Sequence, residues 1–525
     1  MACQTWALQG YGTPLAIFGL YLVKIAVYIA AWWAFCAVSI DGGIGSWWAS
    51  PIAFQKAILW TLTFEVLGLG CGSGPLTGRY LPPVGGALYF LRPGTTKLPP
   101  FPTLPGLGGH RRTLLDVGLY AGLLIACFTA LLSPSIETWQ LCTVGGLLVA
   151  LGLTDKTIFL AARSEHYLSI LVCLLFDDWI AGSKVVWLAI WWWAATSKLN
   201  HHFPAVMCVM TSNSPVQPFP ALKKRLYRNY PDDLRPSKLA QTYTHFGTAL
   251  EYLFPLVLVM SGGGPLTEIT LVIMVVFHLF IMSSVPMGVP LEWNVIMIYG
   301  GVVLFGHHAD VALFSLSSVP LILWLVGVHF ALPLYGSVRP DQVSFLHAMR
   351  YYAGNWAYSV WLFEGRSSAK LDRLTKSSPG VADQLAPFYD ADTIESVLSM
   401  IPAFRLMHLH GRCLHDLLPK AVDDIDDYEW IDGEIVAGLA LGWNFGDGHL
   451  HGTQLLEAIQ AQCHFAPGEL RCILVESQPI HRATHDYRIV DAATGELERG
   501  TLAVATLLQR QPWPSLSEPS PPDGG

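Results

Sequence analysis

Long apolar runs recur over the first 340 positions and are separated by polar or Gly/Pro-rich loops. A helix needs about 20 mostly apolar residues to cross the hydrocarbon core of a bilayer. The runs therefore predict spans at 13–40, 54–70, 113–133, 138–154, 240–261, 266–285, 292–313 and 317–336. A further stretch, 166–198, holds two short apolar runs broken by Asp177 and Asp178. This gives ten spans, or eight with a re-entrant hairpin.

The pattern changes after Arg339. Residues 341–365 are rich in Trp and Tyr and predict an amphipathic helix in the membrane interface. Charged helices are expected over 366–420. Strand-like runs follow at 435–445, 470–480 and 487–509, the last with a hairpin turn. The fold class predicted is an all-α polytopic transmembrane helical bundle of eight to ten spans (1–340), a soluble α+β domain (366–510) and a disordered tail (511–525).

Composition and loop charge support this organisation. Hydrophobic residues make up 52% of the chain and charged residues 13%, against about 25% charged in soluble domains. Lys and Arg gather in the loops 71–112, 154–165 and 199–238 and are absent from 41–53, 134–137 and 262–265. The positive-inside rule then places both termini and the C-terminal domain in the cytoplasm. We expect a multi-pass protein of the cell (plasma or inner) membrane.

The net charge of −8 and the lack of a basic stripe argue against nucleic-acid binding. The ten cysteines show no zinc-like spacing and suit small buried hydrophobes.

Two loops are unusual in composition. The Gly/Pro-dense loop 68–112 also carries Leu, Tyr and Phe, which favours an ordered loop against the membrane over a disordered connector. The loop 203–238 mixes aromatics with cations, which suits anionic lipid or simply a positive-inside loop.

Ionisable groups within apolar spans are costly and are functional candidates. We identify Lys198, His201, His202, His278 and Glu292 as candidate catalytic residues. An amine in an apolar pocket can act as a base, although Lys198 could also extend to the headgroups with the histidine pair beside it. His278 could equally make a packing hydrogen bond. Glu292 in a first helical turn is explained by the helix dipole, or it converges with Lys198 on one pocket.

A possible metal site lies in the Gly-rich segment GWNFGDGHLHG (442–452). His449 and His451 would point to one face of a strand, and Asp447 could complete the ligand set. The alternative is a polar hairpin loop, since no spacing matches a zinc signature. A histidine-box di-iron site ranks lower, because the predicted topology places His307 and His308 on the opposite membrane face from the other histidine pair.

Two resemblances to known families follow from short motifs. The run AATSKLNHHF (194–203) resembles a segment in the membrane domain of vitamin K-dependent gamma-glutamyl carboxylase and its bacterial relatives. That resemblance covers about ten residues and one span, and it implies that Lys198 is the base that deprotonates a reduced quinone.

The phrases LGLGCGSGPLTGRYLPP, SKLNHHFP, VPMGVPLEWN and GWNFGDGHLHG are similar to hallmarks of an uncharacterised family of multi-pass membrane proteins, bacterial and largely actinobacterial. This resemblance spans nearly the whole chain and implies a membrane class without an activity.

Three hypotheses about function follow. The first is an intramembrane enzyme that acts on a lipid or quinone with Lys198 as base. The second is a lipid or small-molecule transporter. The third is a membrane assembly factor that docks a protein partner through its C-terminal domain. Membrane lipids are the expected partners, and a quinone or a metal ion is the candidate cofactor.

Overall fold

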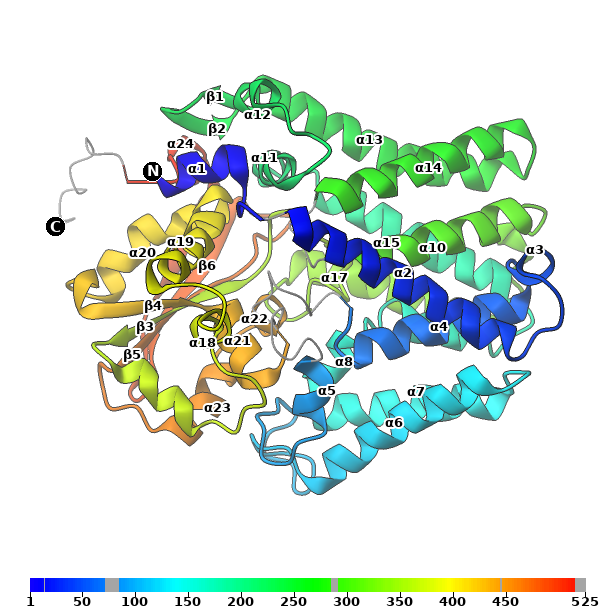
Figure 1. The fold of residues 1–525 in the computed structure, drawn as a ribbon, viewed down its shortest axis with the longest axis horizontal. Helices are drawn as coiled ribbons and strands as arrows, with labels where there is room; N and C mark the ends of the chain where they lie inside the picture. The colour runs from blue at the N-terminus through cyan, green and yellow to red at the C-terminus, as the bar shows by residue number, and fades with distance from the viewer. Residues whose placement is uncertain (14, 71–84, 285–290, 444–445, 515–525) are drawn as a thin grey trace.

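The computed structural model describes residues 1–525 except 14, 71–84, 285–290, 444–445 and 515–525. Most of the described chain is helical, and a five-stranded sheet with its own helices lies near the C-terminus (Figure 1). The helices of the first part, the helical part, are α1 (Ala2–Gln9), α2 (Leu15–Ala37), α3 (Ile44–Trp47), α4 (Pro51–Val66), α5 (Gly85–Phe90), α6 (Leu114–Leu132), α7 (Thr138–Thr154), α8 (Lys156–Ala161), α9 (Tyr167–Cys173), α10 (Trp179–Ser197), α11 (Phe203–Asn213), α12 (Pro220–Arg225), α13 (Lys238–Ser261), α14 (Pro265–Ser284), α15 (Leu291–Gly301), α16 (Val319–Val326) and α17 (Leu332–Val338).

Four described helices are long and apolar enough to cross a membrane: α2, α6, α14 and the continuous helix Val319–Val338, in which a π-helical turn joins α16 to α17. Their apolar side chains face outward. Only 11% of the most hydropathic window of α2 is buried, and Leu22, Val23 and Val27 on it are exposed. An apolar exterior of this extent fits contact with lipid.

The other expected spans are helices that are shorter or less apolar. The expected break at Asp177 and Asp178 is confirmed, because α9 ends at Cys173 and α10 begins at Trp179. Asp178 Oδ2 accepts hydrogen bonds from the backbone N–H groups of Ser317 and Ser318 (2.7 and 2.9 Å). α15 continues into a π-helical turn, Val302–His307. A short hairpin, β1 (Tyr227–Asn229) with β2 (Asp233–Pro236), precedes α13.

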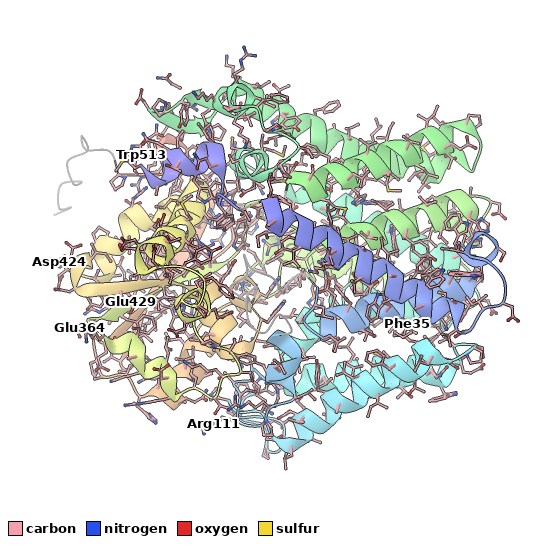
Figure 2. The ribbon with its side chains drawn as sticks, in the orientation of Figure 1. Phe35, Arg111, Glu364, Asp424, Glu429 and Trp513 are labelled. Carbon is pink, nitrogen blue, oxygen red and sulfur yellow. The ribbon has the colours of Figure 1, made fainter. Side chains whose placement is uncertain are left out.

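The two ends of the helical part differ. In Figure 1 the sheet lies beside one end, together with α1, α5, α8, α11 and α12, while α3 and the α6–α7 turn lie at the other end. The described parts of the loops that carry Lys and Arg are therefore gathered on the sheet side. Three acidic residues, Glu364, Asp424 and Glu429, lie on the side of the sheet region that is away from the helical part (Figure 2).

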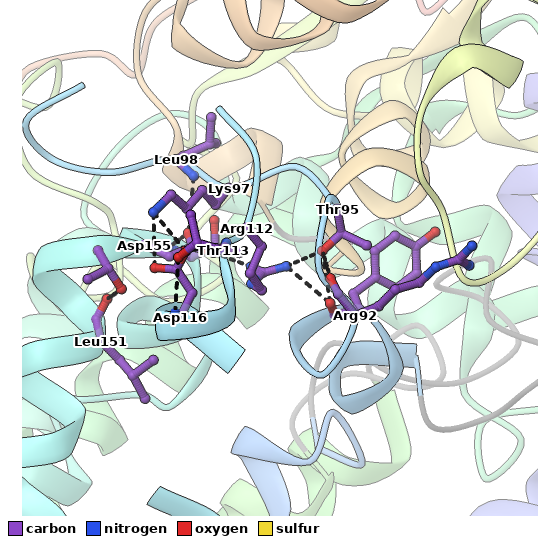
Figure 3. Close-up of polar contacts among 12 residues, drawn as sticks. Arg92, Thr95, Lys97, Leu98, Arg112, Thr113, Asp116, Leu151 and Asp155 are labelled. Carbon is purple, nitrogen blue, oxygen red and sulfur yellow. Dashed lines mark hydrogen bonds and ion pairs between the residues drawn. The ribbon is translucent and has the colours of Figure 1, made fainter. Parts of the chain in front are cut away.

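Two buried ion pairs order the described part of the Gly/Pro-rich loop, residues 85–112 (Figure 3). Lys97 Nζ lies 2.9 Å from Asp116 Oδ2, and Arg112 pairs with Asp155. The loop is ordered, as expected, and it also contacts the sheet region, since Tyr89 donates a hydrogen bond to the carbonyl of Leu439 (2.7 Å). The rest of this expectation, 71–84, falls outside the described residues.

The second part, the sheet region, is an antiparallel sheet of order β4-β3-β5-β6-β7. Its two faces are covered by separate apolar clusters, one with α21 and α23 and the other with α20 and α24. Its elements are β3 (Tyr358–Glu364), α18 (Val381–Leu385), α19 (Ala391–Met407), α20 (Leu414–Ala421), β4 (Tyr428–Asp432), α21 (Gly433–Leu441), α22 (Gly446–His449), α23 (Gln454–Cys463), β5 (Leu470–Val475), β6 (Thr484–Asp491), β7 (Gly495–Ala503) and α24 (Val504–Gln509).

Three expectations about this region need correction. The amphipathic helix over 341–365 does not form: turns lead into β3, a strand buried on both faces, whose apolar run lacks the alternation of a half-buried strand. The strand expected at 435–445 is helix α21, begun by the Asp432 cap and ended by Gly442 at φ +78°. The described start of the tail is ordered, because Trp513 packs against the cluster that contains Trp6 of α1 (Figure 2).

Candidate functional site

Lys198, the expected base, caps the C-terminus of α10 at the sheet-side end of the helical part. Its Nζ forms an ion pair with Oε2 of Glu251 on α13, and the two side chains are 11% and 4% exposed. Nζ also lies 5.6 Å from the centre of the Phe203 ring. The arrangement is therefore a buried ion pair between two helices.

His278 lies deep in the helical part and uses both ring nitrogens. Trp191 Nε1 donates to His278 Nε2 (3.1 Å), so Nε2 is an acceptor. Nδ1 then carries the proton and donates to Asn294 Oδ1 (2.8 Å). The ring is a neutral imidazole that ties α10, α14 and α15 together, which matches the packing alternative left open by the sequence.

Glu292 is 1% exposed and lies in the first turn of α15. Its Oε2 is 3.5 Å from Lys24 Nζ of α2, and Lys24 also donates to the carbonyl of Gly70 (3.3 Å). Glu292 and Lys198 thus have different ionic partners. His278 contacts Asn294, two residues beyond Glu292. A pocket shared by Glu292 and Lys198 stays a prediction.

The adjacent histidines after α10 point to different places. His201 is exposed and lines a cavity described below. His202 is fully buried, and its Nε2 hydrogen-bonds Gln478 Oε1 of the sheet region (2.9 Å). Its ring centre lies 5.0 Å from that of His485, whose pKa burial lowers to about 4. These buried rings are therefore neutral at pH 7 and join the two parts by packing.

The segment proposed for metal binding forms helix α22 and a turn in place of a strand. His449 Nδ1 hydrogen-bonds Ser344 Oγ (2.7 Å), and His451 Nδ1 hydrogen-bonds Glu476 Oε2 (2.9 Å). The Asp447 side chain falls outside what the structure describes. Among the described residues, no three His, Cys, Asp or Glu side chains are placed to hold a metal ion. The metal site therefore stays a prediction.

A cavity of about 340 Å³, here called the basic pocket, opens where the helical part meets the sheet region. Five basic side chains and no Asp or Glu line it. Its walls come from the α10–α11 turn, the β1–β2 hairpin, the first turns of α13 and the sheet region. The lining residues are Leu199, Asn200, His201, Pro204, Ala205, Arg228, Arg235, Pro236, Gln241, His245, Leu409, Arg412 and Leu508.

Arg412 gives the basic pocket its buried charge. The residue is 1% exposed, its Nη1 donates to the carbonyl of Arg510 (2.6 Å), and its Nε has no hydrogen-bond partner among the residues that the structure describes. Burial lowers the pKa of Arg412 to about 10, which leaves it charged at pH 7. Arg235 is balanced by Asp233, with Nε 2.9 Å from Oδ1, whereas Arg412 forms no ion pair with any described residue. The pocket therefore carries uncompensated positive charge.

A second, open hollow of about 520 Å³ continues the basic surface. It is lined by Lys224, Arg225 and Lys238, and it shares Arg228 with the basic pocket. We call it the basic groove. The sequence shows the mixture of aromatics and cations in 203–238, but no local pattern points to Arg412, which lies about 200 positions further along the chain.

These features define a class: a mostly helical transmembrane protein with four candidate spans and a separate sheet region, with polar sites where the two parts meet. The chain belongs to the family described as transmembrane protein of unknown function (DUF3556), whose model matches residues 1–523. This confirms the resemblance to an uncharacterised membrane family. No curated protein and no solved structure matches the chain.

Proposed function

We propose that the protein binds an anionic membrane lipid and holds its phosphate-bearing headgroup in the basic pocket. The observation that carries this proposal is the lining of that pocket, which includes three arginines and two histidines and no carboxylate. A phosphate is the ligand that guanidinium groups favour, because two N–H donors can reach two of its oxygens. A volume of about 340 Å³ suits a headgroup or a small polar ligand.

The place of the basic pocket supports a lipid over a dissolved anion. The pocket lies at the ends of α10 and α13, one residue past Lys198. We propose that the helical part is a bundle of eight to ten spans in the cell membrane, with the sheet region and both termini in the cytoplasm. The pocket and the basic groove then lie at headgroup depth, where the cytoplasmic leaflet is negatively charged.

A second candidate function is an intramembrane enzyme in which Lys198 acts as a base on a lipid or quinone. Its support is the local resemblance to the carboxylase segment and the low exposure of the side chain. Against it, the Lys198 amine is held in an ion pair with Glu251, and Lys198 does not line the basic pocket. This candidate therefore has less support than lipid binding. Lys198→Met should abolish a product change in lipid or quinone extracts if the candidate is right.

Lipid titration of the full chain in a mild detergent tests the proposed function. We expect phosphatidylglycerol to bind more tightly than phosphatidylcholine, with an affinity that falls as salt rises. Arg412→Gln and Arg228→Gln should each weaken phosphatidylglycerol binding by about tenfold, the worth of a lost charge-assisted hydrogen bond. Arg499→Gln is the matched control, because Arg499 is a surface residue on β7 paired with Glu496. Equal affinity for the two lipids, or unchanged affinity in both pocket variants, would contradict the proposal.

A further inference from the structure

Arg350 is a buried cation whose side chain has no partner among the described residues. It is 7% exposed, and none of its three guanidinium nitrogens forms a hydrogen bond within the described part of the chain. It lies between α17 and β3, in the segment that connects the helical part to the sheet region. Burial lowers the pKa of Arg350 to about 10, so the group remains a cation at pH 7.

The other buried arginines show how this protein ordinarily treats such a charge. Arg112 pairs with Asp155, Arg163 with Glu165 and Arg405 with Asp432. Arg412 lacks an ion pair with described residues, and it lines the basic pocket. A buried charge without a counter-charge is strongly destabilising. A guanidinium left in this state points to an anion supplied from outside the chain.

The carboxylate whose field reaches Arg350 is already engaged. Glu476 acts on Arg350 electrostatically, but its Oε2 is hydrogen-bonded to His451 Nδ1 at 2.9 Å. The internal segments outside the described residues, 71–84, 285–290 and 444–445, contain neither Asp nor Glu in the sequence. They therefore supply no counter-charge, and among the described side chains, which do not include that of Asp447, no carboxylate forms an ion pair with Arg350.

The backbone beside Arg350 is held in an uncommon conformation. Met349, which precedes it, has φ +51°, in the left-handed region that disfavours side chains with a Cβ, and Met349 is fully buried. Tyr351, which follows it, donates a hydrogen bond to Glu165 Oε1 (3.3 Å). The flanking residues thus fix this segment against the helical part. Strain of this kind persists where surrounding structure imposes it, and it is concentrated at ligand sites.

We propose that Arg350 anchors an internal anion site between the helical part and the sheet region, and that its ligand is a small molecule bearing a carboxylate or phosphate group. The guanidinium offers that group a planar set of N–H donors. The site is distinct from the basic pocket, whose lining does not include Arg350. Because its ligand lies at the connection between the two parts, occupancy stabilises their docking.

Thermal unfolding of the full chain in mild detergent tests this site, with inorganic phosphate and acetate as probes and chloride at equal ionic strength as control. The wild type should show a saturable rise in melting temperature with phosphate, acetate or both, as expected for a ligand that binds the folded state. The anion that raises the melting temperature identifies the ligand group: phosphate indicates a phosphate group, and acetate indicates a carboxylate. Arg350→Gln should lose this rise and, without anion, melt no lower than the wild type, because it removes an unpaired buried charge.

If Arg350 had a purely structural role, Arg350→Gln would melt well below the wild type without added anion. That result would overturn the proposal, as would a chloride response equal to those of the probes or a response retained by Arg350→Gln. If Arg350→Gln does not accumulate, Arg350→Lys serves instead, since it keeps the charge but loses the planar donor set, and a weakened response is expected. Arg412→Gln should keep the full response, which separates this site from the proposed lipid site.

Discussion

The Lys198–Glu251 ion pair makes a prediction that separates a structural pair from a catalytic base. Removal of one partner leaves the other as an unpaired buried charge, and the side chains are only 11% and 4% exposed. Breaking a buried pair in this way costs about 3–5 kcal/mol, whereas replacement of both partners by apolar residues of similar volume is often neutral or stabilising. We expect Lys198→Met and Glu251→Gln each to destabilise the protein by about that amount, and Lys198→Met with Glu251→Leu to recover most of the loss.

A double-mutant cycle measures this coupling. Unfolding of the full chain is followed in one detergent at fixed concentration, and Arg499→Gln, which removes a surface charge, provides the control. The double variant should melt above both single variants. If its loss of stability equals the sum of the single losses, the two side chains do not act as a pair and the reasoning fails.

Three further predictions concern stability. Because burial holds the pKa of His485 to about 4, against about 6.5 in the unfolded chain, the unfolded state binds more protons between these values. The free energy of unfolding should therefore fall as pH drops from 6.5 to 4, by up to about 1.4 kcal/mol per pH unit for this group, and His485→Gln should flatten the pH profile. Gly442→Ala should lower the melting temperature, since its φ is +78° and a Cβ would lie 2.6 Å from Tyr89 Cγ; an unchanged value would show that the helix end can shift. Arg112→Met should lower the free energy of unfolding by about 3–5 kcal/mol, because it leaves Asp155 as a buried charge without its partner. Denaturant unfolding measures this change, and a loss below about 1 kcal/mol would contradict a buried pair.

The long apolar helices were predictable because length and apolarity are local properties of the sequence. The bounds of α2, α6, α13 and α14 fall within a few residues of the expected spans. The break at Asp178 was also visible, since two adjacent carboxylates cannot remain in an apolar helix without partners.

The sheet region was predicted less well. The run that forms β3 is apolar at nearly every position because both faces of this central strand are buried, so its periodicity could not distinguish strand from helix. The strand expected at 435–445 failed for a related reason. Small and apolar residues fill α21, and the caps that make it a helix, Asp432 and Gly442, lie at its ends.

The sites depend on contacts between distant positions. Lys198 was identified from its place in an apolar run, but its partner Glu251 lies 53 residues further along the chain and becomes a neighbour only when α10 packs on α13. Arg350 was hidden within an aromatic segment that resembled an interfacial helix. What marks Arg350 is the lack of a partner among the described residues, which only the folded structure can show.

The central claim is that the basic pocket holds an anionic lipid, and the most direct test is mass spectrometry of the lipids that remain on the full-length protein after purification in a mild detergent. The wild type should retain an anionic phospholipid in stoichiometric amount through a delipidating wash. The Arg228→Gln, Arg412→Gln double variant should lose it, and Arg499→Gln should retain it. Retention of only zwitterionic lipid, or equal retention of anionic lipid by the wild type and the double variant, would contradict the claim.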